Sequence, residues 1–190
     1  MSYPSIKIQS EDFEITLKYE DKYTPGSADY STSYTKEYWL SETNFFNTCY
    51  GVMVGPLDEP LFSCVLVTHA GFTTPHAHSA FIHDDSLILA IGDHIACLGL
   101  PSLDLIWSLK ADQVTCFGVH YSQKHECIVS HGELEICRIS MNGEMDWRAG
   151  GKDIFTGEVN VLADQVLVTD FNEEKYSIDI TTGKSTLLDG

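Results

Sequence analysis

The stretch Glu126–Trp147, ECIVSHGELEICRISMNGEMDW, decides the fold because its pattern recurs along the chain at a fixed step, the spacing from Trp107 to Trp147. It contains an apolar run, a polar turn, a second apolar run, a tight turn with a glycine, and a tryptophan. An earlier copy is Ser86–Trp107, SLILAIGDHIACLGLPSLDLIW, and a later copy is Gln165–Leu187, QVLVTDFNEEKYSIDITTGKSTL. A fixed period of this length is the sequence signature of a repeat architecture.

Aligned positions keep their chemical character from copy to copy. Trp107 and Trp147 occupy the same place in two successive copies, and Leu187 stands there in the third. The residue four positions before each of these anchors is, in order, Leu103, Gly143 and Gly183. We expect the anchor side chains to wedge between neighbouring units.

Each copy is predicted to be a β-hairpin with further strands. Its apolar runs are rich in Val, Ile and Leu, are too short for helices, and are bounded by turn residues such as Gly92-Asp93. Another strand candidate follows each anchor, at Val114–Tyr121 and at Ile154–Val161. This gives about four strands per copy, and no window of the chain has helical periodicity.

A weaker copy precedes the three clear ones, because one repeat step back from Trp107 reaches Val67, at the end of another strand, turn and strand pattern. We therefore predict one all-β domain over residues 1–190. Within it, residues 1–43 supply N-terminal strands and a polar loop at 21–33, and residues 44–190 form the forty-residue β-repeats.

The expected architecture is a small β-propeller-like repeat domain of about four short blades, each an antiparallel meander. A twisted four-stranded sheet has two apolar faces, so copies must pack face to face to bury them. The last copy has no strand after Leu187, and an N-terminal strand such as Phe13–Leu17 is expected to complete it. Closing the ring in this way would remove its open edges.

One turn supports this architecture by resemblance. The run Tyr176–Lys184, YSIDITTGK, resembles the turn of quinoprotein-type (PQQ-like) β-propeller repeats, whose units continue to a tryptophan four residues after the glycine. Gly143 and Trp147 keep that spacing. The resemblance implies a propeller-type repeat. The family's enzymes have more blades and an adjacent pair of cysteines that is missing here, so we expect no cofactor.

Charge restricts the partners. Against 11 basic residues the chain has 28 acidic ones, and its net charge of −17 disfavours nucleic acid and anionic membranes while favouring a basic protein partner. The chain has no long apolar run and no signal-peptide pattern, so we expect a soluble, cytoplasmic protein. Its six cysteines lie inside apolar runs, which predicts buried, reduced thiols rather than disulfides.

The stretch Thr73–Asp85, TTPHAHSAFIHDD, carries the main chemical signal. If it is a strand, His76 and His78 point to one face and could bind one divalent metal such as zinc, with His83 or Asp85 completing the site. The alternative is a solvated loop or blade edge. The positions one and two repeat steps after these histidines hold no repeated ligand type, so the cluster is peculiar to one copy.

Other catalytic signals are weak. His94, His120, His125 and His131 read as turn or surface residues, and the chain has neither a nucleophile elbow nor a phosphate-binding loop. We therefore expect a non-catalytic protein-interaction module with an acidic surface for a basic partner, such as an immunity or inhibitor-type protein. The alternative is a metal-binding enzyme or sensor that uses His76, His78 and His83.

Overall fold

A computed structural model describes residues 4–10, 12–21, 23, 34–42, 46–56 and 59–188. Within these ranges the chain forms seventeen strands and no helix, which confirms the all-β prediction. The described residues accordingly include no helix that is long and apolar enough to cross a membrane. Most of the polar loop expected at 21–33 lies outside the described residues.

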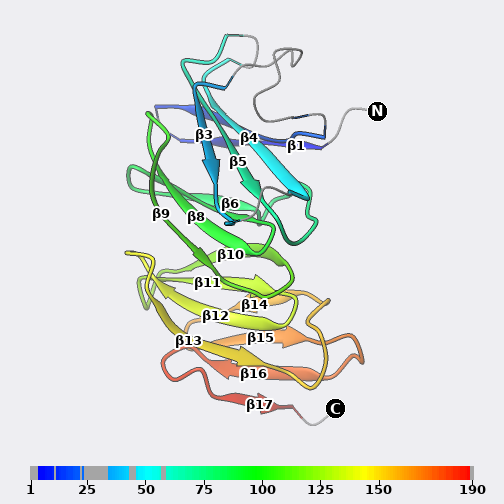
Figure 1. The fold of residues 1–190 in the computed structure, drawn as a ribbon. Coiled ribbons are helices and arrows are strands. Elements are labelled where there is room, and N and C mark those ends of the chain that lie inside the picture. The colour runs from blue at the N-terminus through cyan, green and yellow to red at the C-terminus, as the bar shows by residue number, and fades with distance from the viewer. Residues whose placement is uncertain are drawn as a thin grey trace.

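The strands form four small sheets that stack face to face in chain order (Figure 1). The first sheet has the order β1-β2-β4-β5-β3 and comprises β1 (Ser5–Gln9), β2 (Glu14–Tyr19), β3 (Lys36–Trp39), β4 (Thr48–Val54) and β5 (Phe62–Thr68). The second comprises β6 (Ala80–His83), β7 (Ser86–Ile91), β8 (His94–Gly99) and β9 (Asp104–Lys110). The third comprises β10 (Cys116–Ser122), β11 (Cys127–Gly132), β12 (Glu135–Ser140) and β13 (Met145–Gly150). The fourth comprises β14 (Val159–Val161), β15 (Gln165–Thr169), β16 (Lys175–Asp179) and β17 (Ser185–Leu187).

The last three sheets are antiparallel meanders, as predicted, and this gives each sheet two different ends. Turns that join the first to the second strand and the third to the fourth lie at one end, which we call the turn end. The middle hairpin turn and the loop leading to the next sheet lie at the opposite end, which we call the linker end. The strand that follows each anchor in the sequence therefore begins the next sheet.

Apolar side chains fill the space between successive sheets. Strand β7 is buried on both faces, because alternate side chains of a strand point in opposite directions. Leu87 and Leu89 pack toward the first sheet, while Ile88 and Ala90 pack toward the third. This explains why the central strands read as continuous apolar runs.

The tryptophan anchors lie between sheets, as predicted, and each contacts the glycine turn of the following copy. A Cβ atom on Gly143 would come within 2.5 Å of the Trp107 ring, and one on Gly183 would come within 2.7 Å of the Trp147 ring. The Trp147 Nε1 group also donates a hydrogen bond of 2.8 Å to the carbonyl of Ile180. Leu187, at the third anchor position, is 41% exposed.

The first sheet departs from the predicted pattern. Its anchor is Tyr38 on β3, not Val67, because the Tyr38 hydroxyl donates to the Leu103 carbonyl at 2.9 Å and accepts from the Leu105 amide at 3.2 Å. Strand β3 precedes β4 in the chain yet pairs in parallel with β5. Val67 lies on β5 and packs on the outer face of the first sheet with Tyr23 and Val65.

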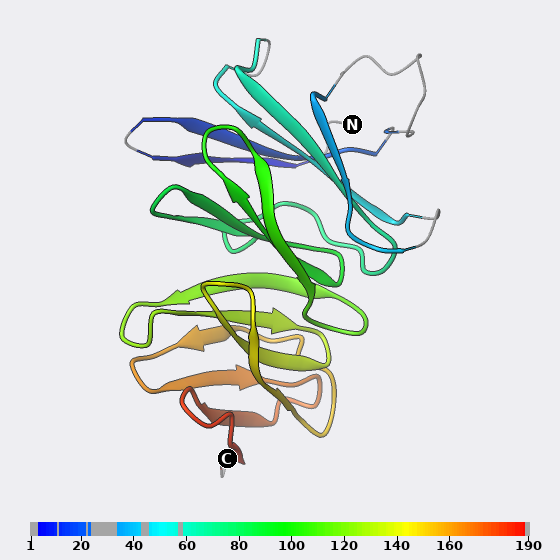
Figure 2. The same ribbon diagram turned by 60° about the vertical axis from the view of Figure 1, so that its left-hand side comes forward.

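The expectation that Phe13–Leu17 completes the last copy is wrong. Strand β2, which contains most of that segment, pairs with β1 and β4 in the first sheet. The fourth sheet obtains its four strands from residues 159–187 alone. Figures 1 and 2 show the first and fourth sheets at opposite ends of the stack, so the described sheets do not close into a ring.

The fourth sheet has one strongly apolar face and one mainly polar face. Val166 and Ile178 face the third sheet, whereas the alternating neighbours Gln165, Ser177 and Asp179 point away from it. A polar face of a sheet can lie against water, whereas an apolar face must be covered.

All six cysteines are buried and free, which confirms the predicted reduced thiols. Burial raises the pKa of Cys64 and of Cys137 to about 12, so both thiols are protonated at neutral pH.

Candidate functional site

A cavity of about 540 Å³ opens at the linker end, where the first strands of three successive sheets come together. Its walls come from the loop before β6, from β10 and β11, and from the segment that leads into β14. The lining residues are His76, His78, Phe117, Gly118, His120, His131, Thr156, Glu158, Val159 and Asn160. Four of the eight histidines of the chain therefore line one cavity.

His76 and His78 lie in a turn before β6 and not on a strand, which agrees with the loop alternative and not with the strand required for the predicted metal pair. The turn is closed by the Ser79 amide, which donates to the His76 carbonyl at 2.9 Å, and by the Ser79 hydroxyl, which accepts from the His76 amide at 2.9 Å. The two imidazoles are inclined at 67° with centroids 6.3 Å apart. They therefore do not point in parallel, as alternate residues of a strand would.

Both ring nitrogens of His76 are already used by the backbone. Its Nε2 lies 2.7 Å from the carbonyl of Phe117, and its Nδ1 lies 3.2 Å from the amide nitrogen of His78. Because a carbonyl only accepts and an amide only donates, Nε2 carries the proton and Nδ1 accepts. His76 thus joins the β6 turn to the third sheet and has no free lone pair for a metal.

His78, which is exposed, and His120, which is half-buried, form a stacked pair in the cavity. Their rings stack at a centroid distance of 4.8 Å and a tilt of 33°. Within the described part of the chain no hydrogen bond engages the ring nitrogens of either residue. These nitrogens are therefore available to a ligand.

His131 lies on β11 at the back of the cavity. Its Nε2 lies 3.4 Å from the Phe155 carbonyl, and its ring meets that of Phe117 edge to face at 5.2 Å. Burial is the main cause that lowers the pKa of both His120 and His131 to about 4, and the neighbouring histidines add to it. Both rings are neutral at pH 7.

The repeat step explains why these residues meet. His78, Gly118 and Glu158 are equivalent positions of three copies, and equivalent positions of stacked copies are neighbours. Gly118 is essential to this arrangement, since a Cβ atom there would come within 2.8 Å of the His78 carbonyl. Ligand types do not repeat at this step; instead, the step places different side chains around one cavity.

The other two predicted metal ligands lie elsewhere. His83 ends β6 at the turn end, where its ring stacks on Tyr121 at 4.5 Å and its Nε2 lies 3.5 Å from Asp84. Asp85 follows in the β6–β7 turn, and its carbonyl accepts from the Leu100 amide. In the described residues, no group of three or more His, Cys, Asp or Glu side chains is placed to hold a metal ion.

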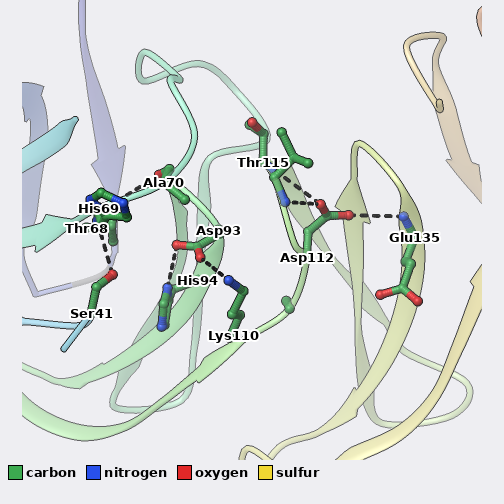
Figure 3. A network of polar contacts seen from close by, with 12 residues as sticks. Ser41, Thr68, His69, Ala70, Asp93, His94, Lys110, Asp112, Thr115 and Glu135 are labelled. Atoms are coloured by element: carbon green, nitrogen blue, oxygen red, sulfur yellow. Dashed lines mark hydrogen bonds and ion pairs between the residues drawn. The ribbon is translucent and has the colours of Figure 1, made fainter. Parts of the chain in front are cut away.

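A second polar cluster at the linker end joins loops and turns (Figure 3). The Asp93 carboxylate lies 2.7 Å from His94 Nδ1 and 3.0 Å from Lys110 Nζ. Burial alone would raise the pKa of Asp93, but the hydrogen bonds from His94 and Lys110 outweigh it and lower that pKa. Asp93 is therefore a paired, ionised structural carboxylate.

Asp112 in the β9–β10 loop is fully buried and accepts four backbone hydrogen bonds (Figure 3). Its donors are the amides of Val114, Thr115, Leu134 and Glu135, at 2.7, 3.2, 2.9 and 3.0 Å. With its lone pairs occupied, Asp112 clamps the loop to the β11–β12 turn. It offers no free oxygen to a substrate or metal.

Comparisons with known proteins do not identify a family. No family model matches the sequence, and no curated protein matches it. Among solved structures, the chain is similar to the WD40 β-propeller domain of Doa1, with 13% sequence identity and a TM-score of 0.48. The match covers 75% of this chain and 50% of that chain, so the chain spans half the length of the structure it matches.

Proposed function

We propose that this protein is a non-catalytic interaction module that binds a basic protein partner through its acidic linker end. The observation that carries the proposal is that most Lys and Arg side chains are already paired within the protein. Eight of the ten described Lys and Arg side chains already pair with a carboxylate of the same chain. The surplus of carboxylates is therefore not compensated from within the protein, and its field attracts a cationic surface.

The linker end is favoured over the turn end because it combines unpaired carboxylates with the cavity. Glu158 and Glu173 are exposed there, and Glu133 is half-exposed. None of the three forms an ion pair in the described structure. A partner that covered this end would meet negative charge around a preformed hollow.

The test is binding of a ten-residue lysine peptide, measured by isothermal titration calorimetry. We expect binding at about 50 mM salt that weakens strongly by about 500 mM, because salt screens exposed charges. Changing Glu133, Glu158 and Glu173 together to Gln should weaken it about tenfold, as each exposed pair contributes at most about 1 kcal/mol.

The matched control neutralises three carboxylates at the turn end, with Asp85→Asn, Glu126→Gln and Glu144→Gln. This variant has the same net charge as the linker-end variant and should bind almost as the unmodified protein does. Equal weakening in both variants would contradict a role for the linker end, and no binding at low salt would contradict the basic partner.

Two finer hypotheses remain predictions. An immunity or inhibitor-type role predicts one basic enzyme, such as a toxin or nuclease, whose activity is blocked by an equimolar amount of this protein. The second hypothesis is that the turns at Gly143 and Gly183 belong to quinoprotein-type repeats. This resemblance concerns the repeat and does not imply a bound cofactor.

A further inference from the structure

We propose that the cavity at the linker end is an anchor pocket for an arginine side chain of the basic partner. The inference rests on the proposed function and names the group that the partner would insert. Four features of the cavity carry it: its hydrogen-bonding capacity, its charge, its flat ring faces and its accessibility.

The cavity offers acceptors more than donors. His76 and His131 direct their Nε2 protons to the carbonyls of Phe117 and Phe155, which leaves Nδ1 of His131 as an acceptor. The ring nitrogens of His78 and His120 have no protein partner within the described structure, and a neutral imidazole has one acceptor and one donor nitrogen. Glu158 adds two acceptor oxygens at the rim. A guanidinium group has five N–H donors and no acceptor, so it matches this wall.

The charge of the cavity is also suited to a cation. Glu158 contributes a carboxylate at the rim, and the described lining contains neither Lys nor Arg. His120 and His131 do not cancel this charge, because both are neutral at pH 7. The net charge of −17 on the whole chain adds a field of the same sign.

The rings favour arginine over lysine. His78 and His120 stack on each other, which leaves the outer face of each ring for a further planar group, and Phe117 lines the cavity with a third ring. A planar guanidinium is weakly hydrated and stacks on such faces, whereas an ammonium is a compact and strongly hydrated charge. Arginine is also among the side chains that most often dominate the energy of protein interfaces.

The cavity can be reached from solvent. His78, Glu158 and Asn160 at its rim are exposed, while His120 and His131 are half-buried deeper inside. Its volume of about 540 Å³ is that of a typical ligand site and exceeds what one long side chain needs. An arginine at the tip of a partner's loop could therefore enter with water around it.

The test compares ten-residue arginine and lysine peptides of equal charge on the intact protein. We expect the arginine peptide to bind about 3- to 10-fold more tightly, in line with the strength of cation–ring contacts. His78→Ala should remove this preference by weakening the arginine peptide alone. His125→Ala, at the turn end, is the matched control and should retain the preference.

The outcomes separate the two proposals. If both peptides bind equally to the unmodified protein, or if His78→Ala retains the preference, the anchor pocket is wrong while the acidic binding module stands. If neither peptide binds, the proposed function itself fails. A second variant, His120→Gln, with its fold checked by thermal melting, should also lose the preference, and an unchanged preference there would overturn the pocket.

Discussion

Trp107 on β9 lies against Gly143 in the β12–β13 turn of the next sheet, so the anchor of one copy is completed by the turn of the following copy. The Trp107 Nε1 group donates a hydrogen bond of 3.2 Å to the Met141 carbonyl in the same turn. The pair Trp147 and Gly183 repeats the contact one sheet further along. The glycine of a copy therefore contacts the preceding sheet, and the tryptophan of the same copy contacts the following sheet.

Gly143→Ala should destabilise the protein by about 2 kcal/mol, since Gly143 has a φ of +84° and the added methyl group would collide with the Trp107 ring. Urea unfolding followed by tryptophan fluorescence measures this. Gly150→Ala is the control, because a Cβ there meets only the Leu134 carbonyl at 3.5 Å. Similar losses in the two variants would contradict the role of the Trp107 contact.

Tyr38→Phe should lower the free energy of unfolding by about 1 kcal/mol, because it removes one hydrogen bond to Leu103 and leaves the Leu105 amide without its acceptor. The same unfolding experiment applies. An unchanged stability would show that β3 does not anchor the first sheet on the second.

Asp112→Ala should destabilise by about 3 kcal/mol, because four backbone amides lose a buried, charged acceptor at once. Asp112→Asn should be nearly as harmful, since its NH2 group would face N–H donors. The exposed Asp85→Asn variant is the reference. A loss below about 1 kcal/mol for Asp112→Ala would contradict the clamp.

Stability should fall as the pH is lowered from about 6.5 to about 4. The pKa of His120 and of His131 is lowered to about 4 in the folded state, so in this window the unfolded chain binds more protons than the folded one. We expect a loss of about 2 kcal/mol per histidine, less than the full linkage value because the rings are partly exposed. Urea unfolding at several pH values should show a flatter profile for the His120→Gln/His131→Gln variant.

Zinc should not bind stoichiometrically at pH 7, because His76 uses both ring nitrogens and His83 lies at the other end of β6. Equilibrium dialysis against zinc, followed by elemental analysis of untagged protein, is the measurement. Near-stoichiometric zinc that disappears in a His76→Ala/His78→Ala variant would instead favour the metal alternative.

The fold of the last three sheets could be predicted because their information is local and repeated. The two strands and the turn of each hairpin are consecutive in the sequence. The spacing from Trp107 to Trp147 shows which hairpins occupy equivalent positions. The first sheet could not be predicted in the same way. Its edge strand β3 comes before β4 and β5 in the chain and pairs in parallel with β5, whereas the edge strand of each later sheet follows its neighbour along the chain. The repeat pattern places the fourth strand of each sheet after the third, so it does not reveal a fourth strand that lies earlier in the sequence.

The candidate site was predicted in part. The sequence singles out His76 and His78 by their spacing, whereas it predicts His120 and His131 to be turn or surface residues because they are scattered around strand ends. The signal that would have grouped them is the stacking of equivalent positions: His120 and Asn160 are one repeat step apart, and both line the cavity beside His78. His83 is near His78 in sequence, but the length of β6 separates the two ends of that stretch.

The buried cysteines can report the order in which the sheets separate during unfolding. Cys49 and Cys64 lie in the first sheet, Cys97 in the second, and Cys116, Cys127 and Cys137 in the third. A buried, protonated thiol is alkylated only when its surroundings open. The order in which these cysteines become labelled under mild denaturant therefore reads out which interface of the stack separates first.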